Sequence, residues 1–159
     1  MKGFGSFQMQ RGAVAIEFAG VFVLFFAVLY GLLGYCVPLL MLQAFNDAAA
    51  SGARIAISVN PQADNYETLL HQVVTDEVDK RLAWMPDAWH QGCYGGSYLE
   101  DAPLPTETIG EEERVYTRIN VCVSYPYTAS PIVPLLTLPG IGTIPHLPDV
   151  LKGQASLLF

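Results

Sequence analysis

Charged side chains are scarce in this sequence, and basic ones are scarcest of all. Asp, Glu, Lys and Arg make up 14% of the 159 residues, against 52% hydrophobic residues. Eight Lys and Arg stand against 15 Asp and Glu, so the formal net charge is -7. The only adjacent basic pair, Lys80-Arg81, directly follows an acidic stretch. This balance argues against DNA or RNA as a partner, because neutralising phosphates needs clustered cations.

The motifs of common catalytic classes are also missing. No G-x-S-x-G elbow, P-loop, G-x-G-x-x-G or H-E-x-x-H occurs. His90 and Cys93 have the spacing of metal ligands but lack a second pair of ligands. We therefore expect no enzymatic activity, no metal site and no cofactor.

Cysteine is rare, with Cys36 near the end of an apolar run and Cys93 and Cys122 in an acidic region. Outside the cytoplasm, Cys93 and Cys122 can form a disulfide and leave Cys36 unpaired. Two free thiols are the alternative, and the cysteines alone do not settle the compartment.

A long apolar run near the N-terminus is the most prominent feature present. From Ala13 to Leu42 the only formal charge is Glu17. About 20 apolar residues in a helix cross the roughly 30 Å hydrocarbon core of a bilayer, and Ala13–Leu33 already supplies that length. Secretory signals have shorter apolar regions, of about 7 to 15 residues. The run predicts a membrane-spanning helix.

The cations flanking this run predict its orientation. Lys2 and Arg11 precede the run, and the next cation, Arg54, lies well beyond it. By the positive-inside rule the N-terminus is cytoplasmic, and Tyr30 and Tyr35 fall where an outer aromatic belt lies. The acidic remainder is then periplasmic or extracellular.

Glu17 needs an explanation, because an ionisable residue inside a span is a functional hypothesis by default. Its partner is either Arg11 or a new amine created by cleavage between Gly12 and Ala13. Such an amine could pair with Glu17 of a neighbouring subunit and fix the axial register of the two helices. The alternative is that Glu17 lies among the headgroups and the span starts one turn later.

The residues around Glu17 resemble a known signal. Arg11-Gly12, then "AVAIEF" and the apolar run, resembles the class III signal of type IV pilin-like proteins. In those proteins a prepilin peptidase in the membrane cuts after the glycine, and the fifth mature residue is glutamate. The resemblance implies cleavage between Gly12 and Ala13 and an assembly role for Glu17 and Phe18.

A narrower resemblance covers about residues 11–57. "RGAVAIEFAGVFVLF" followed by "QAFNDAAASGARIAI" is similar to TadE-like pseudopilins of tight-adherence (Flp) pilus systems. In that family the Ala-rich stretch ends in Gly-Ala-Arg, which is Gly52, Ala53 and Arg54 here. The major Flp pilin is far shorter and has tyrosine after the glutamate, so this chain is similar to a minor pilin or assembly factor. A TadF-like role stays open, whereas TadG-like proteins are typically much longer.

The resemblance implies a division into a cytoplasmic leader (1–12), a transmembrane helix (13–42) and an exported domain (43–159). It implies a single pass through the inner membrane, with the C-terminal domain periplasmic and incorporation into a pilus left open. The implied partners are a prepilin peptidase and other pilins and minor pseudopilins, and the implied role is pilus biogenesis and adhesion.

The exported part predicts an α+β domain. The first helix is expected to continue to Asn60-Pro61, with a kink where Pro38 leaves the bilayer. A stripe of small residues on it lets another helix approach closely or packs on the chain's own domain, and the two interpretations are compatible; its members are Ala44, Ala48, Ala49, Gly52 and Ile55. Asp64 and Glu67 form a capping-box pattern that starts an amphipathic helix running to about Met85.

The alternation in residues 114–125 predicts a strand whose apolar face meets this amphipathic helix. Cys122 lies on the opposite face, where a bridge to Cys93 would close 28 intervening residues and stabilise the fold by about 3 to 4 kcal/mol. "GQASLLF" predicts a final strand beside the first, in a short antiparallel sheet. The proline-rich residues 126–148 are too apolar for a disordered tail and are expected to pack on the domain or on a partner.

Two rival hypotheses remain at this stage. One is an uncleaved single-pass anchor carrying a periplasmic binding or scaffold module. The other is a secreted protein cut near residues 47–51, against which the overlong apolar run counts.

Overall fold

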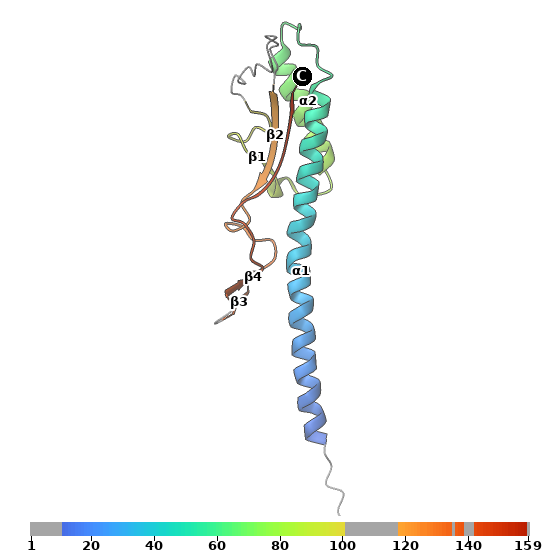
Figure 1. The fold of residues 1–159 in the computed structure, drawn as a ribbon, viewed down its shortest axis with the longest axis vertical. Helices are drawn as coiled ribbons and strands as arrows, with labels where there is room; N and C mark the ends of the chain where they lie inside the picture. Colours follow the sequence, from blue (N-terminus) through green and yellow to red (C-terminus); the bar gives the residue numbers. More distant parts are fainter. Residues whose placement is uncertain (1–10, 101–117, 135, 139–141, 159) are drawn as a thin grey trace, which may run out of the picture.

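The fold consists of one very long helix and a small domain on its C-terminal half (Figure 1). The computed structural model describes residues 11–100, 118–134, 136–138 and 142–158. The helices are α1 (Arg11–Ala56), α2 (Tyr66–Leu82) and the 3-10 turn η1 (Asp87–Trp89). The strands are β1 (Gln91–Gly92), β2 (Arg118–Tyr125), β3 (Leu136–Leu138), β4 (Gly142–Ile144) and β5 (Leu151–Leu158). This is the predicted α+β fold.

The main sheet is antiparallel with strand order β1-β2-β5. β2 and β5 pair along their full lengths, from Arg118 opposite Leu158 to Tyr125 opposite Leu151. Both predicted strands are therefore confirmed, although residues 114–117 lie outside the described part. β3 and β4 pair only with each other, in a separate ribbon.

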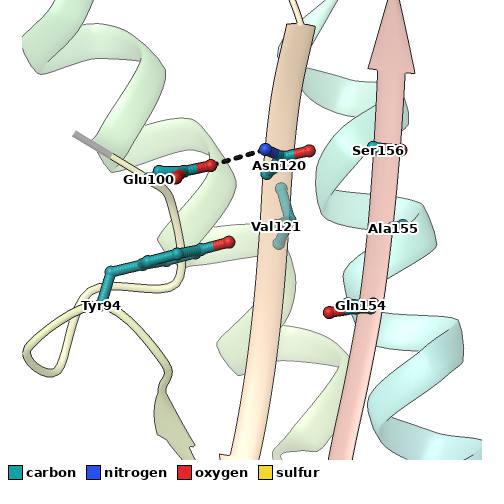
Figure 2. A pocket seen from close by; sticks show the side chains of 7 residues that line it. All are labelled: Tyr94, Glu100, Asn120, Val121, Gln154, Ala155 and Ser156. Atoms are coloured by element: carbon teal, nitrogen blue, oxygen red, sulfur yellow. Dashed lines mark hydrogen bonds between the residues drawn. The ribbon is translucent and has the colours of Figure 1, made fainter. Parts of the chain in front are cut away.

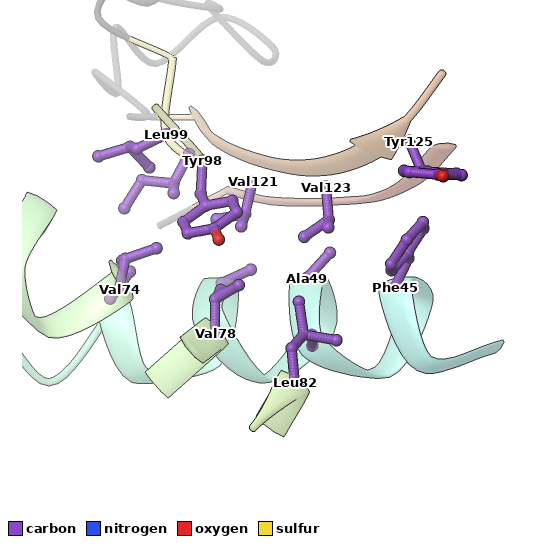
Figure 3. Packing of buried hydrophobic residues seen from close by; sticks show 14 of the residues in the cluster. Phe45, Ala49, Val74, Val78, Leu82, Tyr98, Leu99, Val121, Val123 and Tyr125 are labelled. Atoms are coloured by element: carbon purple, nitrogen blue, oxygen red, sulfur yellow. The ribbon is translucent and has the colours of Figure 1, made fainter. Parts of the chain in front are cut away.

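The core lies between this sheet and the two helices (Figure 3). From β2, the alternate residues Ile119, Val121, Val123 and Tyr125 are buried, as are Leu70, Val74, Val78 and Leu82 of α2. Buried residues thus recur at every second position of β2 and at every fourth position of α2, so each element turns one apolar side toward the other. The predicted contact between the apolar strand face and the amphipathic helix is confirmed.

The stripe of small residues on α1 packs against the chain's own domain. Ala48 and Ala49 are fully buried, and α1 contacts α2, β2 and β5. Small side chains let three elements approach one helix closely, since little volume separates the backbones. The intramolecular interpretation of the stripe is confirmed.

The capping box predicted for α2 is wrong. The N-cap is Asn65, without a side-chain cap, and its carbonyl accepts from the Leu69 N–H at 3.0 Å. The Tyr66 N–H donates to the Ala63 carbonyl at 3.1 Å, so a turn precedes the helix. This turn moves the first helical residue by one position, and Asp64 and Glu67 lose the capping spacing.

The predicted ends of both helices are also corrected. α1 ends at Ala56 rather than at Asn60-Pro61, because Ser58 folds back and bonds to the Ile55 carbonyl through its N–H (2.9 Å) and its hydroxyl (2.7 Å). α2 ends at Leu82, three residues before Met85. α1 runs through Pro38 as one continuous helix, with Pro38 fully buried against the domain.

Candidate functional site: the exposed half of the N-terminal helix

The exposed half of α1, residues 14–28, lies outside the domain that packs on the rest of the helix. Every residue from Val14 to Val28 is exposed. Phe18 and Phe22 lie one turn apart with ring centroids 5.9 Å from each other, and Phe22 and Phe26 continue the row at 4.5 Å. An apolar surface of this extent marks a site of membrane or protein contact.

By length and composition, one helix among the described residues can cross a membrane, and it is α1. Its most apolar 18-residue window has a mean hydropathy of 2.3 and no residue buried against the domain. The exposed half of the helix is therefore a candidate membrane anchor.

Glu17 stands alone on this apolar surface. Its side chain is exposed, and it has no hydrogen-bond or ion-pair partner among the described residues. Its neighbour Phe18 is 67% exposed. Whatever satisfies the Glu17 carboxylate in a lipid environment must therefore come from outside the described chain.

The Gly12–Ala13 peptide bond lies in the first turn of α1, which begins at Arg11. The first four N–H groups of a helix have no intrahelical partner. Opening the chain at this bond consequently costs little backbone hydrogen bonding, whereas a cut further along would have to unwind the helix.

The family motif Gly52-Ala53-Arg54 lies in the domain-facing half of α1. A Cβ atom on Gly52 would stand 3.0 Å from Cγ2 of Val78 and 3.4 Å from Cγ1 of Val121. Ala53 is buried and Arg54 is exposed. The first two residues of the motif thus let α2 and β2 approach α1, which is a packing role.

Cys93 and Cys122 form the disulfide that the sequence favoured, with their Cα atoms 5.5 Å apart. Cys122 lies on the face of β2 turned away from the helices, as predicted, and the Cys93 N–H donates to its carbonyl at 3.4 Å. Cys36 is free and exposed. The bridge attaches the loop after β1 to the central strand.

His90 belongs to a polar network, while Cys93 is held in the disulfide. The Tyr98 hydroxyl donates to Asp79 at 2.9 Å, and its oxygen lies 3.0 Å from Nδ1 of His90. No group of metal-binding residues occurs in the part of the chain that the structure describes. The network connects α2 to the segment beside β1.

Burial and the hydrogen bond to Asp79 raise the pKa of Tyr98 well above its ordinary value. The unfolded chain ionises this tyrosine near pH 10, while the folded chain keeps its proton. Stability is therefore complete below about pH 10 and falls above it. We expect the free energy of unfolding of Tyr98→Phe to decrease less steeply above pH 10 than that of the wild type, by up to about 1.4 kcal/mol per pH unit.

Urea unfolding of the full chain in detergent between pH 8 and 11 measures this difference. Tyr98→Phe should be less stable by about 1 kcal/mol at neutral pH, because it removes two hydrogen bonds, and should lose less stability on going to alkaline pH. If the wild type and Tyr98→Phe lose the same free energy of unfolding between pH 8 and 11, ionisation of Tyr98 does not contribute to the loss of stability at alkaline pH.

A polar hollow of about 420 Å³ lies on the outer face of the sheet (Figure 2). Asn120 donates to Glu100 at 2.5 Å across it, and Tyr94, Gln154 and Ser156 line it further. The alternation along β2 places Asn120 on the same face as Cys122, but the sequence did not indicate the hollow. The alternation along β2 was the available signal, whereas the contribution of β5 depended on its register.

These features define a class: a small α+β domain on a long helix whose free half is apolar, with one carboxylate near its start. Within that class, residues 12–54 match the family model for TadE-like proteins. The match confirms the resemblance over this segment, which is about a quarter of the chain. No curated protein and no solved structure shows significant similarity to the chain.

Proposed function

We propose that this protein is a minor pseudopilin or assembly component of a tight-adherence (Flp) pilus, with a role in pilus biogenesis and adhesion and no enzymatic activity. One observation carries the proposal: the free half of α1 is apolar on all sides and bears a single carboxylate, Glu17, five residues after Gly12. Lipid can cover this half before assembly, and helices of other pilins after it. The family match over residues 12–54 supports this reading.

Cleavage after Gly12 gives Glu17 a partner. It creates an amine at Ala13, four residues or about 6 Å along the helix axis from Glu17. The Glu17 side chain leans toward the helix N-terminus, so it reaches the amine of a neighbour displaced by about one turn. Each charge is costly alone in a low dielectric, and pairing removes much of that cost.

The proposed topology is a cytoplasmic N-terminus and a periplasmic domain. The cations Lys2 and Arg11 precede the span, which favours their retention in the cytoplasm. The Cys93–Cys122 bridge supports an oxidising compartment for the domain. The prepilin peptidase then acts at the membrane on residues 12 and 13, and other pilins or pseudopilins contact the mature helix.

The test is the intact mass and N-terminal sequence of the chain co-expressed with a prepilin peptidase. We expect the wild type to begin at Ala13 and Gly12→Ala to begin at Met1, because the peptidase requires the glycine. Gly20→Ala is the matched control: Gly20 lies in the same helix, and a Cβ there meets nothing within 4 Å. It should be cut like the wild type.

A wild-type chain that still begins at Met1 would contradict the proposal and leave an uncleaved anchor carrying a binding or scaffold module. In that case the polar hollow beside Asn120 would be the first place to look for a ligand. A chain beginning near Ser51 would contradict both the pseudopilin and the uncleaved anchor, and would indicate a secreted protein.

A further inference from the structure

A second apolar part of the chain lies beside α1, at a distance from the main sheet. It consists of the ribbon β3–β4 with its described flanks, residues 131–134 and 145–146, and is called the C-terminal ribbon below. Residues 131–145 contain no charged side chain, and about half of them are Leu, Ile or Val. Figure 1 shows β3 and β4 beyond the end of the main sheet, alongside the middle of α1.

The ribbon is held to α1 at both of its ends. The Tyr30 hydroxyl donates to the carbonyl of Pro134, and the His146 N–H donates to the Tyr35 hydroxyl at 3.0 Å. Pro145, next to His146, is buried against Gly34 of α1. A Cβ atom added to Gly34 would stand 3.4 Å from Cδ of Pro145. The ribbon therefore follows the helix at residues 30–35. Its first flank also contacts the domain, because the Val133 N–H donates to the hydroxyl of the buried Tyr127 at 3.4 Å.

The attachment point lies at a definite depth. If the span begins at Ala13, Tyr30 stands about 25 Å along the helix axis, close to the far boundary of a hydrocarbon core of about 30 Å. That boundary is where tyrosine side chains gather in membrane proteins. The carbonyl of Pro134, bonded to Tyr30, is at the same level.

Backbone hydrogen bonding sets how deep the ribbon can go. A two-stranded ribbon is marginally stable in water by itself, and the described strands of the main sheet do not extend it. Each of its two described strands has one edge without a strand partner, and unpaired backbone groups are not tolerated in hydrocarbon. The headgroup region suits it, because apolar side chains can reach the acyl chains there while backbone groups stay hydrated.

We propose that the C-terminal ribbon is a second membrane contact, which rests in the headgroup region of the bilayer that α1 crosses. The occupant of its surface is phospholipid, since the ribbon is continuous with the exposed half of α1 and has no charge to repel lipid tails. It fixes the height and tilt of the domain over the membrane. The inference depends on α1 as an anchor, not on cleavage after Gly12.

Depth-dependent quenching in proteoliposomes tests the proposal. The full chain carries Cys36→Ser, so that an environment-sensitive dye can be attached at one introduced cysteine at a time. Thr137→Cys places it in β3, Ala19→Cys in the exposed half of α1, and Thr68→Cys in α2 of the domain. The vesicles contain phosphatidylethanolamine and phosphatidylglycerol, with or without lipid bearing a nitroxide quencher near the headgroup or deep in the acyl chain.

We expect the dye at position 137 to be quenched most strongly by the nitroxide near the headgroup. The dye at position 19 should be quenched by lipid-borne nitroxide at either depth. The matched dye at 68 should be quenched only by iodide in the water. A dye at 137 that behaves like the one at 68 would overturn the proposal. So would shielding of position 137 from both lipid quencher and iodide, which would indicate a protein partner such as a second copy.

The dye at position 19 separates two kinds of failure. Quenching at 19 without quenching at 137 would overturn the ribbon contact alone and leave the pseudopilin proposal standing. Absence of quenching at both positions would show that α1 is not in the bilayer, which would overturn the ribbon contact and the membrane-anchored assembly role together.

Discussion

Replacing Glu17 by alanine is expected to leave cleavage after Gly12 intact and to prevent assembly of the mature chain. The variant removes the partner of the Ala13 amine and leaves that amine unpaired among apolar helices. Losing one member of a buried ion pair costs about 3 to 5 kcal/mol, so even the lower figure weakens association by roughly 100-fold. The variant should stay in the membrane, because its helix becomes more apolar.

The measurement is the fraction of cleaved chain that co-purifies with other pilins of the same pilus system after extraction from membranes. Glu67→Ala is the matched control, since Glu67 is an exposed glutamate on α2, far along the chain from the cleavage site. It should co-purify like the wild type.

Two outcomes would contradict this account of Glu17. If Glu17→Ala assembles as well as the wild type, the carboxylate is not an assembly contact, and its place among the headgroups becomes the better explanation. If the variant is no longer cut, Glu17 is instead part of what the peptidase recognises.

Gly153→Ala is expected to destabilise the domain strongly. Gly153 lies on β5 where this strand crosses α1, and a Cβ there would stand 2.4 Å from the carbonyl carbon of Phe45 and 2.5 Å from the nitrogen of Asn46. These are backbone atoms in the middle of a helix, which cannot move aside as a side chain can. Forcing β5 away from α1 separates two elements that share the core, at a cost of about 3 kcal/mol or more.

Thermal or urea unfolding of the full chain in detergent, followed by tryptophan fluorescence, measures this cost. Trp89 reports on the domain because it packs against the core. Gln154→Ala is the neighbouring control, with an exposed side chain on the same strand, and should change stability by less than about 0.5 kcal/mol. Equal unfolding midpoints for Gly153→Ala and the wild type would mean that β5 and α1 are not in such close contact.

Figure 3 shows the packing of α1 against the sheet, which Gly153→Ala is expected to disturb. Phe45 and Ala49 of α1 face Val121, Val123 and Tyr125 of β2, and a large residue next to small ones fills the space between the layers. Gly52 and Gly153 are the positions where side-chain volume has been removed altogether. Gly52 and Ala53 of the Gly-Ala-Arg motif therefore pack the domain against α1. The predicted cleavage and assembly residues, Gly12, Ala13 and Glu17, lie near the N-terminus of the same helix.

The polar network around Tyr98 and the hollow beside Asn120 were not recognised from the sequence. His90 was noted for its spacing to Cys93, but its contact is Tyr98, eight residues along the chain, and Tyr98 in turn bonds to Asp79 on another element. Spacing rules apply within one helix, strand or loop. They do not show which polar groups meet when two elements pack.

The sequence by itself determined the features that depend on neighbours along the chain. A long apolar run with Glu17 as its single charge predicted α1 as a span. Period-two alternation predicted β2 and the face on which Cys122 lies, and a helical period predicted the buried side of α2. The resemblance around Gly12 and Glu17 likewise rests on a short contiguous segment, and the family match covers that segment. Such patterns need no knowledge of the rest of the fold.

Only the tertiary structure decided what covers each surface. It assigned the small-residue stripe of α1 to the chain's own domain, closed the Cys93–Cys122 bridge, and moved the start of α2 through the turn at Ala63. It also brought Pro134 to Tyr30 and His146 to Tyr35, pairs separated by 104 and 111 residues. Contacts over such separations follow from how whole elements pack around a shared core, and local periodicity does not encode that packing.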